Sequence, residues 1–238
     1  PAPEQKGHRM RVLRAFLGSG IASLLLLIGI SPATAYADTA RVGTGAHCPT
    51  EHRSRGTNSA PTTQFGPYFR DDWRLGPTVL PRTGALGQML RGYRRTDHVS
   101  SYWFLGCYWQ TDPQTGKSGW WYPDNNGFVL RNGKPVEHLT TLRKGQLVDI
   151  FGSGFGNFLA PAGTPYAKRA IPPSNLDTYV AAYPFSYHLY RVVDPFEVHA
   201  GPIRPWFGQP GLGLQYLSDL TIPKLIEAKK LEEVNVRR

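Results

Sequence analysis

Apolar residues follow two different patterns along this chain. Residues 15–30 form one almost unbroken apolar block, whereas after residue 116 the apolar residues gather in short clusters separated by glycine, proline and polar residues. Short clusters rich in β-branched and aromatic residues are typical of strands joined by turns. We therefore expect strands at 120–122, 145–151, 187–193 and 196–200. The pattern predicts a mainly β protein.

Helix signals are fewer. Residues 86–93 are predicted to form a short helix, and Thr221 followed by Pro223 is typical of a helix start, because proline is tolerated in the first turn. Residues 38–66 are polar and irregular in composition. We expect this segment to be an arm, followed by an N-terminal extension at 67–115 and a main domain at 116–238.

The apolar block at 15–30 has the surroundings of an export signal. It follows four basic residues and precedes a sequence of small residues that ends at Ala37. This order predicts a secretory signal peptide at residues 1–37, with residues 1–9 lying upstream of Met10. The block is shorter than the roughly 20 residues that a membrane-spanning helix needs. We expect cleavage after Ala37 and an extracellular or cell-surface protein; a retained membrane anchor is the alternative.

The chain is basic, with 27 Lys and Arg against 17 Asp and Glu. Residues 1–37 hold four of the basic residues and one of the acidic ones, which leaves 23 against 16 and a charge of +7 after cleavage. Such a charge attracts nucleic acid or a dinucleotide diphosphate, or it serves solubility alone. Because no finger, helix-turn-helix or ribonucleoprotein signature is present, we expect no nucleic-acid partner.

Two cysteines, Cys48 and Cys107, remain in the mature sequence. In a secreted chain an even count favours one disulfide, which would tie the arm to the extension. Two free thiols are the alternative if the chain is not exported.

The segment EVHAGPIRPWFGQPGLGLQY, residues 197–216, carries the chemistry most suggestive of a site. Its closely spaced glycines and prolines prevent one regular helix or one long strand from running through it. A rigid loop of this kind can present Trp206 and Gln209 to a ligand, since binding groups are often carried on loops. A buried corner with Trp206 in the core is the alternative.

Four segments in this order resemble the catalytic domain of the tuberculosis necrotizing toxin family. They are WWYPDNNGF, DIFGSGFGNFLAPAGTPYAKRAIPP, YHLYRV and the 197–216 segment. The upstream RLGPTVLPRTGALGQMLRGYRR is similar to the extension of fungal surface NADases of that family. The resemblance implies an α+β, mostly β fold, a compact sandwich-like domain distantly related to ADP-ribosyltransferases. It also implies hydrolysis of NAD to nicotinamide and ADP-ribose, and a homodimer built through the extension.

The resemblance assigns roles to particular residues. Gln209 is the implied catalytic residue, because a neutral amide can bind a ribose hydroxyl or the attacking water at any pH. Arg169 matches the substrate arginine, whose planar guanidinium can clamp a diphosphate. Phe151 and Phe158 match aromatic substrate positions, and Trp206 and His188 are weaker candidates for substrate binding. The alternatives without a functional role are a solvated glutamine, a surface arginine and aromatic residues of the core.

Calcium is where the sequence departs from the fungal pattern. Fungal members are expected to bind this ion through acidic residues near the carboxyl terminus, and here only Glu232 and Glu233 lie nearby. Two carboxylates do not make the six to eight oxygen ligands that calcium takes. We expect NAD as the substrate, with NADP as a further candidate. We expect no required cofactor.

Three hypotheses about function follow. The first is a secreted NAD glycohydrolase that depletes NAD; if it is a toxin, an immunity protein is an expected partner. The second is an ADP-ribosyltransferase, although the usual catalytic glutamate is not evident beside Gln209. The third is a secreted binding module that keeps the aromatic groove without turnover.

Overall fold

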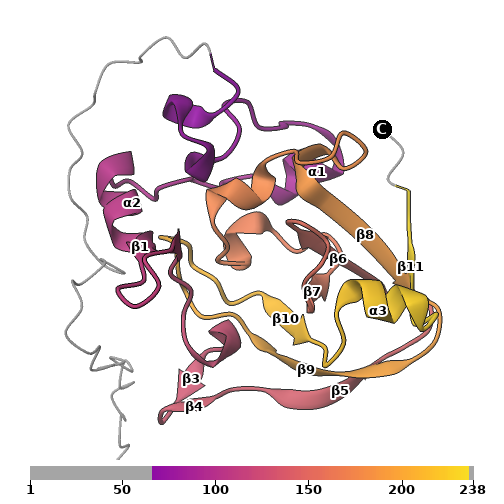
Figure 1. The fold of residues 1–238 in the computed structure, drawn as a ribbon. Coiled ribbons are helices and arrows are strands. Elements are labelled where there is room, and N and C mark those ends of the chain that lie inside the picture. Colours follow the sequence, from indigo (N-terminus) through magenta and orange to yellow (C-terminus); the bar gives the residue numbers. More distant parts are fainter. Residues whose placement is uncertain (1–65, 236–238) are drawn as a thin grey trace, which may run out of the picture. The chain divides into compact units, whose positions relative to one another are not determined.

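The computed structural model describes residues 66–235, and a seven-stranded antiparallel sheet dominates them (Figure 1). The strand order is β11-β8-β6-β7-β10-β9-β5. The strands are β5 (His138–Leu142), β6 (Leu147–Phe151), β7 (Phe158–Pro161), β8 (Tyr187–Val192), β9 (Phe196–Pro202), β10 (Leu214–Leu217) and β11 (Leu231–Glu233).

Smaller elements surround this sheet. Two short antiparallel pairs are β1 (Trp109–Thr111) with β2 (Ser118–Trp120), and β3 (Leu130–Arg131) with β4 (Lys134–Pro135). The α-helices are α1 (Gly84–Met89), α2 (Ser101–Tyr108) and α3 (Ile222–Glu227). Six 3-10 turns complete the described part: η1 (Phe69–Asp71), η2 (Trp73–Leu75), η3 (Asn125–Gly127), η4 (Tyr166–Lys168), η5 (Pro173–Leu176) and η6 (Pro184–Ser186).

The predicted mostly β fold is confirmed, and the strands expected at 145–151, 187–193 and 196–200 correspond to β6, β8 and β9. Thr221 precedes α3 as predicted, with a proline in the first turn. The strand expected at 120–122 was wrong beyond Trp120, where β2 ends. The loop expected at 197–216 is shorter than predicted, because β9 and β10 occupy its two ends and pair with each other.

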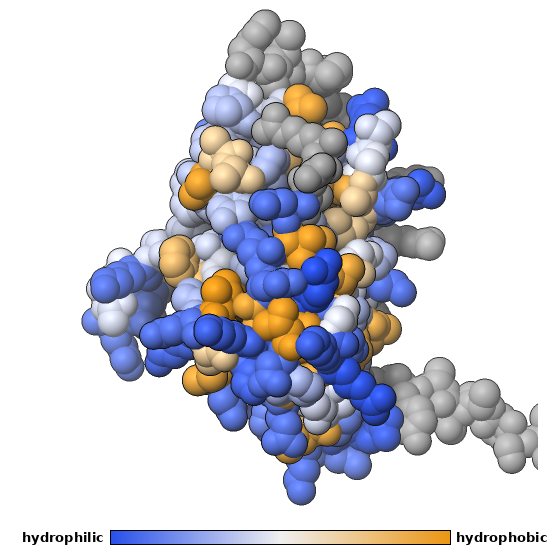
Figure 2. All heavy atoms as spheres, turned by 90° about the vertical axis from the view of Figure 1, so that its right-hand side faces the viewer, coloured by the Kyte–Doolittle hydropathy of each residue, from blue (hydrophilic) through white to orange (hydrophobic). Residues whose placement is uncertain are grey.

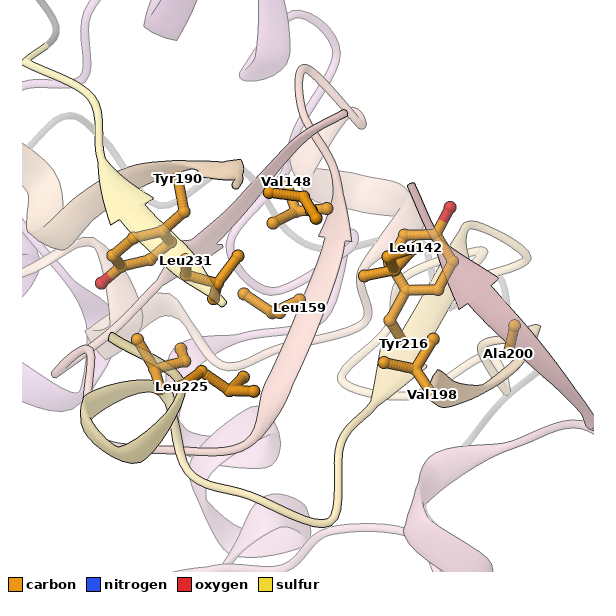
Figure 3. Close-up of a cluster of buried hydrophobic side chains, with 11 residues drawn as sticks. Leu142, Val148, Leu159, Tyr190, Val198, Ala200, Tyr216, Leu225 and Leu231 are labelled. Atoms are coloured by element: carbon orange, nitrogen blue, oxygen red, sulfur yellow. The ribbon is translucent and has the colours of Figure 1, made fainter. Parts of the chain in front are cut away.

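The main core lies on one face of the sheet, where it collects side chains from both ends of the strand order. Leu142 of β5 and Leu231 of β11 belong to the same buried cluster, so the sheet must curve to bring its outer strands together. Figure 3 shows Leu159 of β7 between side chains of these two halves. Leu225 of α3 closes the cluster from outside the sheet. Because of this curvature, the two halves of one sheet enclose a core between them, as the two sheets of a sandwich do.

The N-terminal extension packs onto the main domain through two further clusters. Met89 and Leu90, at the end of α1, join a buried cluster that contains Phe151 and Tyr166. The second cluster combines Leu75, Phe104 and Tyr108 of the extension with Phe207 of the main domain. Because both clusters mix residues from the two segments, the described part of the extension folds as one body with the main domain.

The surface on the α3 and β11 side is largely hydrophilic, with small apolar patches between charged side chains (Figure 2). Within residues 66–235, no helix has the length and apolar character needed to cross a membrane. The predicted signal peptide, the arm and Cys48 lie outside the described residues. Those expectations therefore stay predictions.

Candidate active site

A cavity of about 510 Å³ opens over the three middle strands of the sheet, β6, β7 and β10. Its volume is in the range of small-molecule and cofactor sites. Its wall is completed by the loop that contains η3, by residues 169–171 and by residues 203–204. Six lining residues carry the argument below: Phe151, Phe158, Arg169, Asn175, Arg204 and Gln215.

Arg169 lies in the cavity wall, as expected for a substrate-binding arginine, although its side chain is only 5% exposed. Its guanidinium forms an ion pair with Asp149 of β6 at 2.7 Å, and its Nε donates to the Thr164 carbonyl at 3.0 Å. The guanidinium also lies 5.0 Å from the Phe151 ring centroid. These contacts fix the arginine in one orientation, which favours a bidentate grip on a planar or tetrahedral anion.

Asp149 is fully buried and holds Arg169 from the sheet side. Its Oδ2 accepts hydrogen bonds from the Gly163 N–H at 2.9 Å and from the Tyr187 hydroxyl at 3.1 Å. Burial raises the pKa of this carboxyl, while the Arg169 charge and the two donors act in the opposite direction. The sequence analysis missed Asp149, although a single charge inside the apolar run of β6 was the available signal.

Phe151 and Phe158 both line the cavity, but they differ in exposure. Phe151 is 1% exposed and packs edge-on against Tyr166, whereas Phe158 is 36% exposed at the start of β7. The Asn175 amide nitrogen donates to the Phe151 carbonyl at 3.0 Å, which fixes the end of β6. Phe158 is therefore the ring that a ligand can stack on, and Phe151 forms the floor beneath Arg169.

Gln215 is the glutamine that the structure places in the cavity wall. It lies on β10, and its Nε2 donates to the Asn126 carbonyl at 2.9 Å. One of the two amide N–H groups is used there, which leaves the amide oxygen and the second N–H for a ligand. The sequence analysis quoted this residue within a matched segment but did not select it.

Gln209 lies behind the cavity wall and is not among the lining residues. Its side chain is buried, and its Nε2 donates to the carbonyl of Ile171 at 2.7 Å. Ile171 itself lines the cavity, so Gln209 contacts the wall from outside. Gln209, the residue expected to act on the substrate, is thus separated from the cavity by the backbone of Ile171.

Trp206 and His188 also lie outside the cavity wall. The Trp206 indole donates to the Trp121 carbonyl at 2.7 Å and packs on the Tyr108 ring, as in the core alternative. The His188 ring of β8 packs tilted against the Tyr183 ring, with centroids 4.0 Å apart, and its Nδ1 lies 3.6 Å from a Glu233 carboxylate oxygen. Both aromatic rings are held by protein neighbours, so neither is positioned to touch a ligand in this cavity.

Glu232 and Glu233 are neighbours on β11 and point to opposite faces of the strand. Glu232 pairs with Arg191 at 2.9 Å, and Glu233 accepts from the Tyr183 hydroxyl at 3.0 Å. In the described part of the chain no group of three or more His, Cys, Asp and Glu residues could hold a metal ion. We derive no calcium-dependent step from these residues.

Comparison with known proteins gives a consistent result. The family model described as tuberculosis necrotizing toxin matches residues 141–234. The conidial surface nicotinamide adenine dinucleotide glycohydrolase of Aspergillus fumigatus is 42% identical over 167 residues, which covers 70% of this chain and 70% of the relative. The structure of tuberculosis necrotizing toxin complexed with its immunity factor aligns with a TM-score of 0.52 at 16% identity, covering 76% of this chain and 100% of the toxin chain.

The fold and the site define a mostly β protein with one arginine-bearing ligand cavity over the middle of its sheet. The match to the Aspergillus fumigatus relative covers more than two thirds of both chains, and at 42% identity it is a likeness in sequence as well as in architecture. The chain belongs to the tuberculosis necrotizing toxin family. The likeness to the toxin structure supports the fold.

Proposed function

We propose that this protein is a secreted NAD glycohydrolase, which cleaves the bond between nicotinamide and ribose to release nicotinamide and ADP-ribose. The observation that carries the proposal is the convergence of Arg169, Phe158 and Gln215 on one cavity. An anion clamp, a stacking surface and a neutral amide are the groups that a dinucleotide with a cationic ring requires. The relative from Aspergillus fumigatus is a conidial surface NAD glycohydrolase, which supports the same activity.

Arg169 would bind the diphosphate of the substrate. The ion pair with Asp149 holds the guanidinium in place, and the 3.0 Å bond from Nε to Thr164 leaves the two terminal nitrogens to share between Asp149 and the substrate. A fixed guanidinium loses little conformational freedom when it binds an anion. Arg204, which lines the same cavity, adds positive charge there.

Gln215 would act on the ribose. The nicotinamide leaves as a neutral molecule, so no general acid is needed, and the barrier lies in an oxocarbenium-like sugar and in placing a water. The Gln215 amide oxygen, turned away from Asn126, can accept a hydrogen bond from a ribose hydroxyl or from that water. We therefore assign to Gln215 the catalytic role that the sequence analysis gave to Gln209.

Phe158 would stack on an aromatic ring of the substrate. Its 36% exposure leaves one face open to the cavity. A cationic nicotinamide gains about 0.5 to 2 kcal/mol from such a face, and this attraction is lost when the ring leaves uncharged. Stacking of this kind serves binding more than the chemical step.

The proposed processing and location of the protein rest on its sequence. Cleavage after Ala37, a Cys48–Cys107 disulfide and a location outside the cell or on its surface are mutually consistent, since disulfides persist in oxidising compartments. The conidial surface location of the relative supports export. A homodimer and an immunity-type protein partner are further proposals, the second because the toxin structure is a complex with its immunity factor.

The proposal is tested by incubating the purified chain from residue 38 onward with NAD and separating the products. We expect nicotinamide and ADP-ribose in equal amounts, with no cofactor added. Nicotinamide without free ADP-ribose, and with ADP-ribose attached to an acceptor, would instead support the transferase hypothesis. Binding of NAD without nicotinamide release would support a binding module.

A further inference from the structure

We propose that Gln209 is a positioning residue, which holds the backbone on the far side of Arg169 and thereby keeps that arginine in the cavity. The inference rests on the proposed function, because the duty assigned to Arg169 is to bind the substrate. It differs from a catalytic role in that Gln209 itself touches only protein.

The contact that defines this role is a single buried hydrogen bond. The Gln209 Nε2 donates to the Ile171 carbonyl at 2.7 Å across 38 positions of sequence, and Gln209 is 4% exposed. Its Oε1 is buried, and no hydrogen-bond partner for it occurs within residues 66–235. A buried amide whose oxygen has no hydrogen-bond partner costs stability. Loss of the bond to Ile171 would leave the amide nitrogen without a partner as well.

Ala170, between Arg169 and Ile171, has a backbone that needs such support. Its φ is +48°, and it is 5% exposed. Residues with a Cβ rarely adopt this left-handed conformation, and it persists only where surrounding contacts hold it. Left-handed Ala170 is part of the turn by which Arg169, Ala170 and Ile171 all reach the cavity wall.

The loop that carries Gln209 forms hydrogen bonds to the chain both before and after Arg169. Before Arg169, the Ala167 carbonyl accepts from the Gly211 N–H at 3.2 Å and the Lys168 carbonyl accepts from the Gly213 N–H at 3.0 Å. After Arg169, the contact is the Gln209 side chain on Ile171. Among these three bonds, only the one from Gln209 is made by a side chain, so it is the one that a substitution can remove.

The extension fixes the other side of the same loop. Phe207 is fully buried among Phe104, Tyr108 and Trp120. The Gly208 N–H points to the Tyr108 hydroxyl at 3.3 Å, and a Cβ at Gly208 would lie 2.7 Å from the Cβ of Asp97. The loop therefore cannot slide away from the cavity wall without breaking the aromatic cluster, and Gln209 transmits that rigidity to Arg169.

The kinetic test compares Gln209→Ala with wild type and with the exposed Gln114→Ala in the β1–β2 turn. We expect Gln209→Ala to raise the KM for NAD about tenfold or more, with a smaller fall in kcat, because Arg169 would no longer be held in its binding position. Gln114→Ala should stay near wild type. A loss confined to kcat would overturn the proposal, as would an unchanged KM.

A second measurement keeps the inference separate from the proposed activity. Hydrogen exchange of the peptide spanning 166–172, without substrate, should be at least severalfold faster in Gln209→Ala than in wild type. The exposed Gln114→Ala in the β1–β2 turn is the matched control and should exchange as wild type does. Unchanged exchange in Gln209→Ala would refute the positioning role even if NAD is hydrolysed. Faster exchange would support it even if NAD is not the substrate.

Discussion

Asp149 and Arg169 form an ion pair at 2.7 Å in which both side chains are at least 95% buried. The pair joins the sheet to the 166–171 segment at the cavity, so it belongs both to the fold and to the site. Two charges out of water are stable only while each compensates the other. This dependence makes the pair the first target for a stability prediction.

Asp149→Asn is expected to destabilise the protein by about 3 to 5 kcal/mol, because it leaves the Arg169 charge buried without its partner. Urea unfolding followed by fluorescence measures this loss. The exposed Arg191–Glu232 pair provides the control, since its side chains are 48% and 49% exposed. Glu232→Gln should change the free energy of unfolding by less than about 1 kcal/mol. Equal effects of the two substitutions would contradict the account.

Phe158→Ala and Phe151→Ala separate substrate stacking from core packing. Phe158 is 36% exposed at the cavity and Phe151 is 1% exposed, so we expect the first substitution to raise the KM for NAD at nearly unchanged stability. Phe151→Ala should cost about 3 to 5 kcal/mol of stability, the usual range for a truncated buried phenylalanine. Thermal unfolding and steady-state kinetics on the two variants check this. A large stability loss for Phe158→Ala with unchanged KM would rule out the stacking role.

Asp177 makes stability depend on pH. It is 2% exposed, both carboxylate oxygens lack a hydrogen-bond partner within residues 66–235, and burial raises its pKa to about 7. A carboxyl with a raised pKa keeps its proton in the folded protein while the unfolded chain has already lost it. The free energy of unfolding should therefore fall as pH rises from about 4 through 7.

Asp177→Asn is expected to remove this slope and to stabilise the protein by about 2 kcal/mol or more at pH 8. The measurement is urea unfolding of both proteins at pH 5 and pH 8. At pH 5 the advantage of the variant should be present but clearly smaller than at pH 8, since the unfolded carboxyl is already ionised there while the native one is still protonated. A variant less stable than wild type at pH 8 would show that the ionised carboxylate has a partner.

Phe207→Ala tests whether the extension and the main domain are one cooperative body. Phe207 is fully buried in the cluster with Leu75, Phe104 and Tyr108. We expect a loss of about 3 to 5 kcal/mol and a single unfolding transition monitored by tryptophan fluorescence and by circular dichroism. Two separate transitions in the wild-type protein would contradict the one-body description.

The sequence allowed part of the sheet to be predicted, together with α1 in part and the start of α3. The strands β6, β8 and β9 stood out because β-branched and aromatic residues gather there between turn residues. Helix α2 was missed because its sequence, SYWFLGCY, is apolar on all sides and shows no helical stripe. The remaining signal was Ser100, whose Oγ accepts the Trp103 N–H as an N-cap.

The choice between the two glutamines depended on a strand that the sequence analysis did not predict. Tyr216 of β10 is buried in the core, and alternation then puts Gln215 on the opposite face of the strand. Gln209 precedes this strand in an irregular loop with positive φ at Phe207, Gly208 and Gly211, whose path no periodicity can reveal. The resemblance pointed to the segment that holds both glutamines, and the fold places Gln215 in the cavity wall and Gln209 behind it.

The most direct test of the account is the rate of nicotinamide release from NAD by the wild-type chain, Gln215→Ala and Gln114→Ala. Gln215 lines the cavity, whereas Gln114 is exposed in the β1–β2 turn. We predict that wild type and Gln114→Ala release nicotinamide at similar rates, and that Gln215→Ala lowers kcat by about 100-fold or more, since one lost transition-state hydrogen bond costs that much. A Gln215→Ala variant that is folded and as fast as wild type would contradict the central claim.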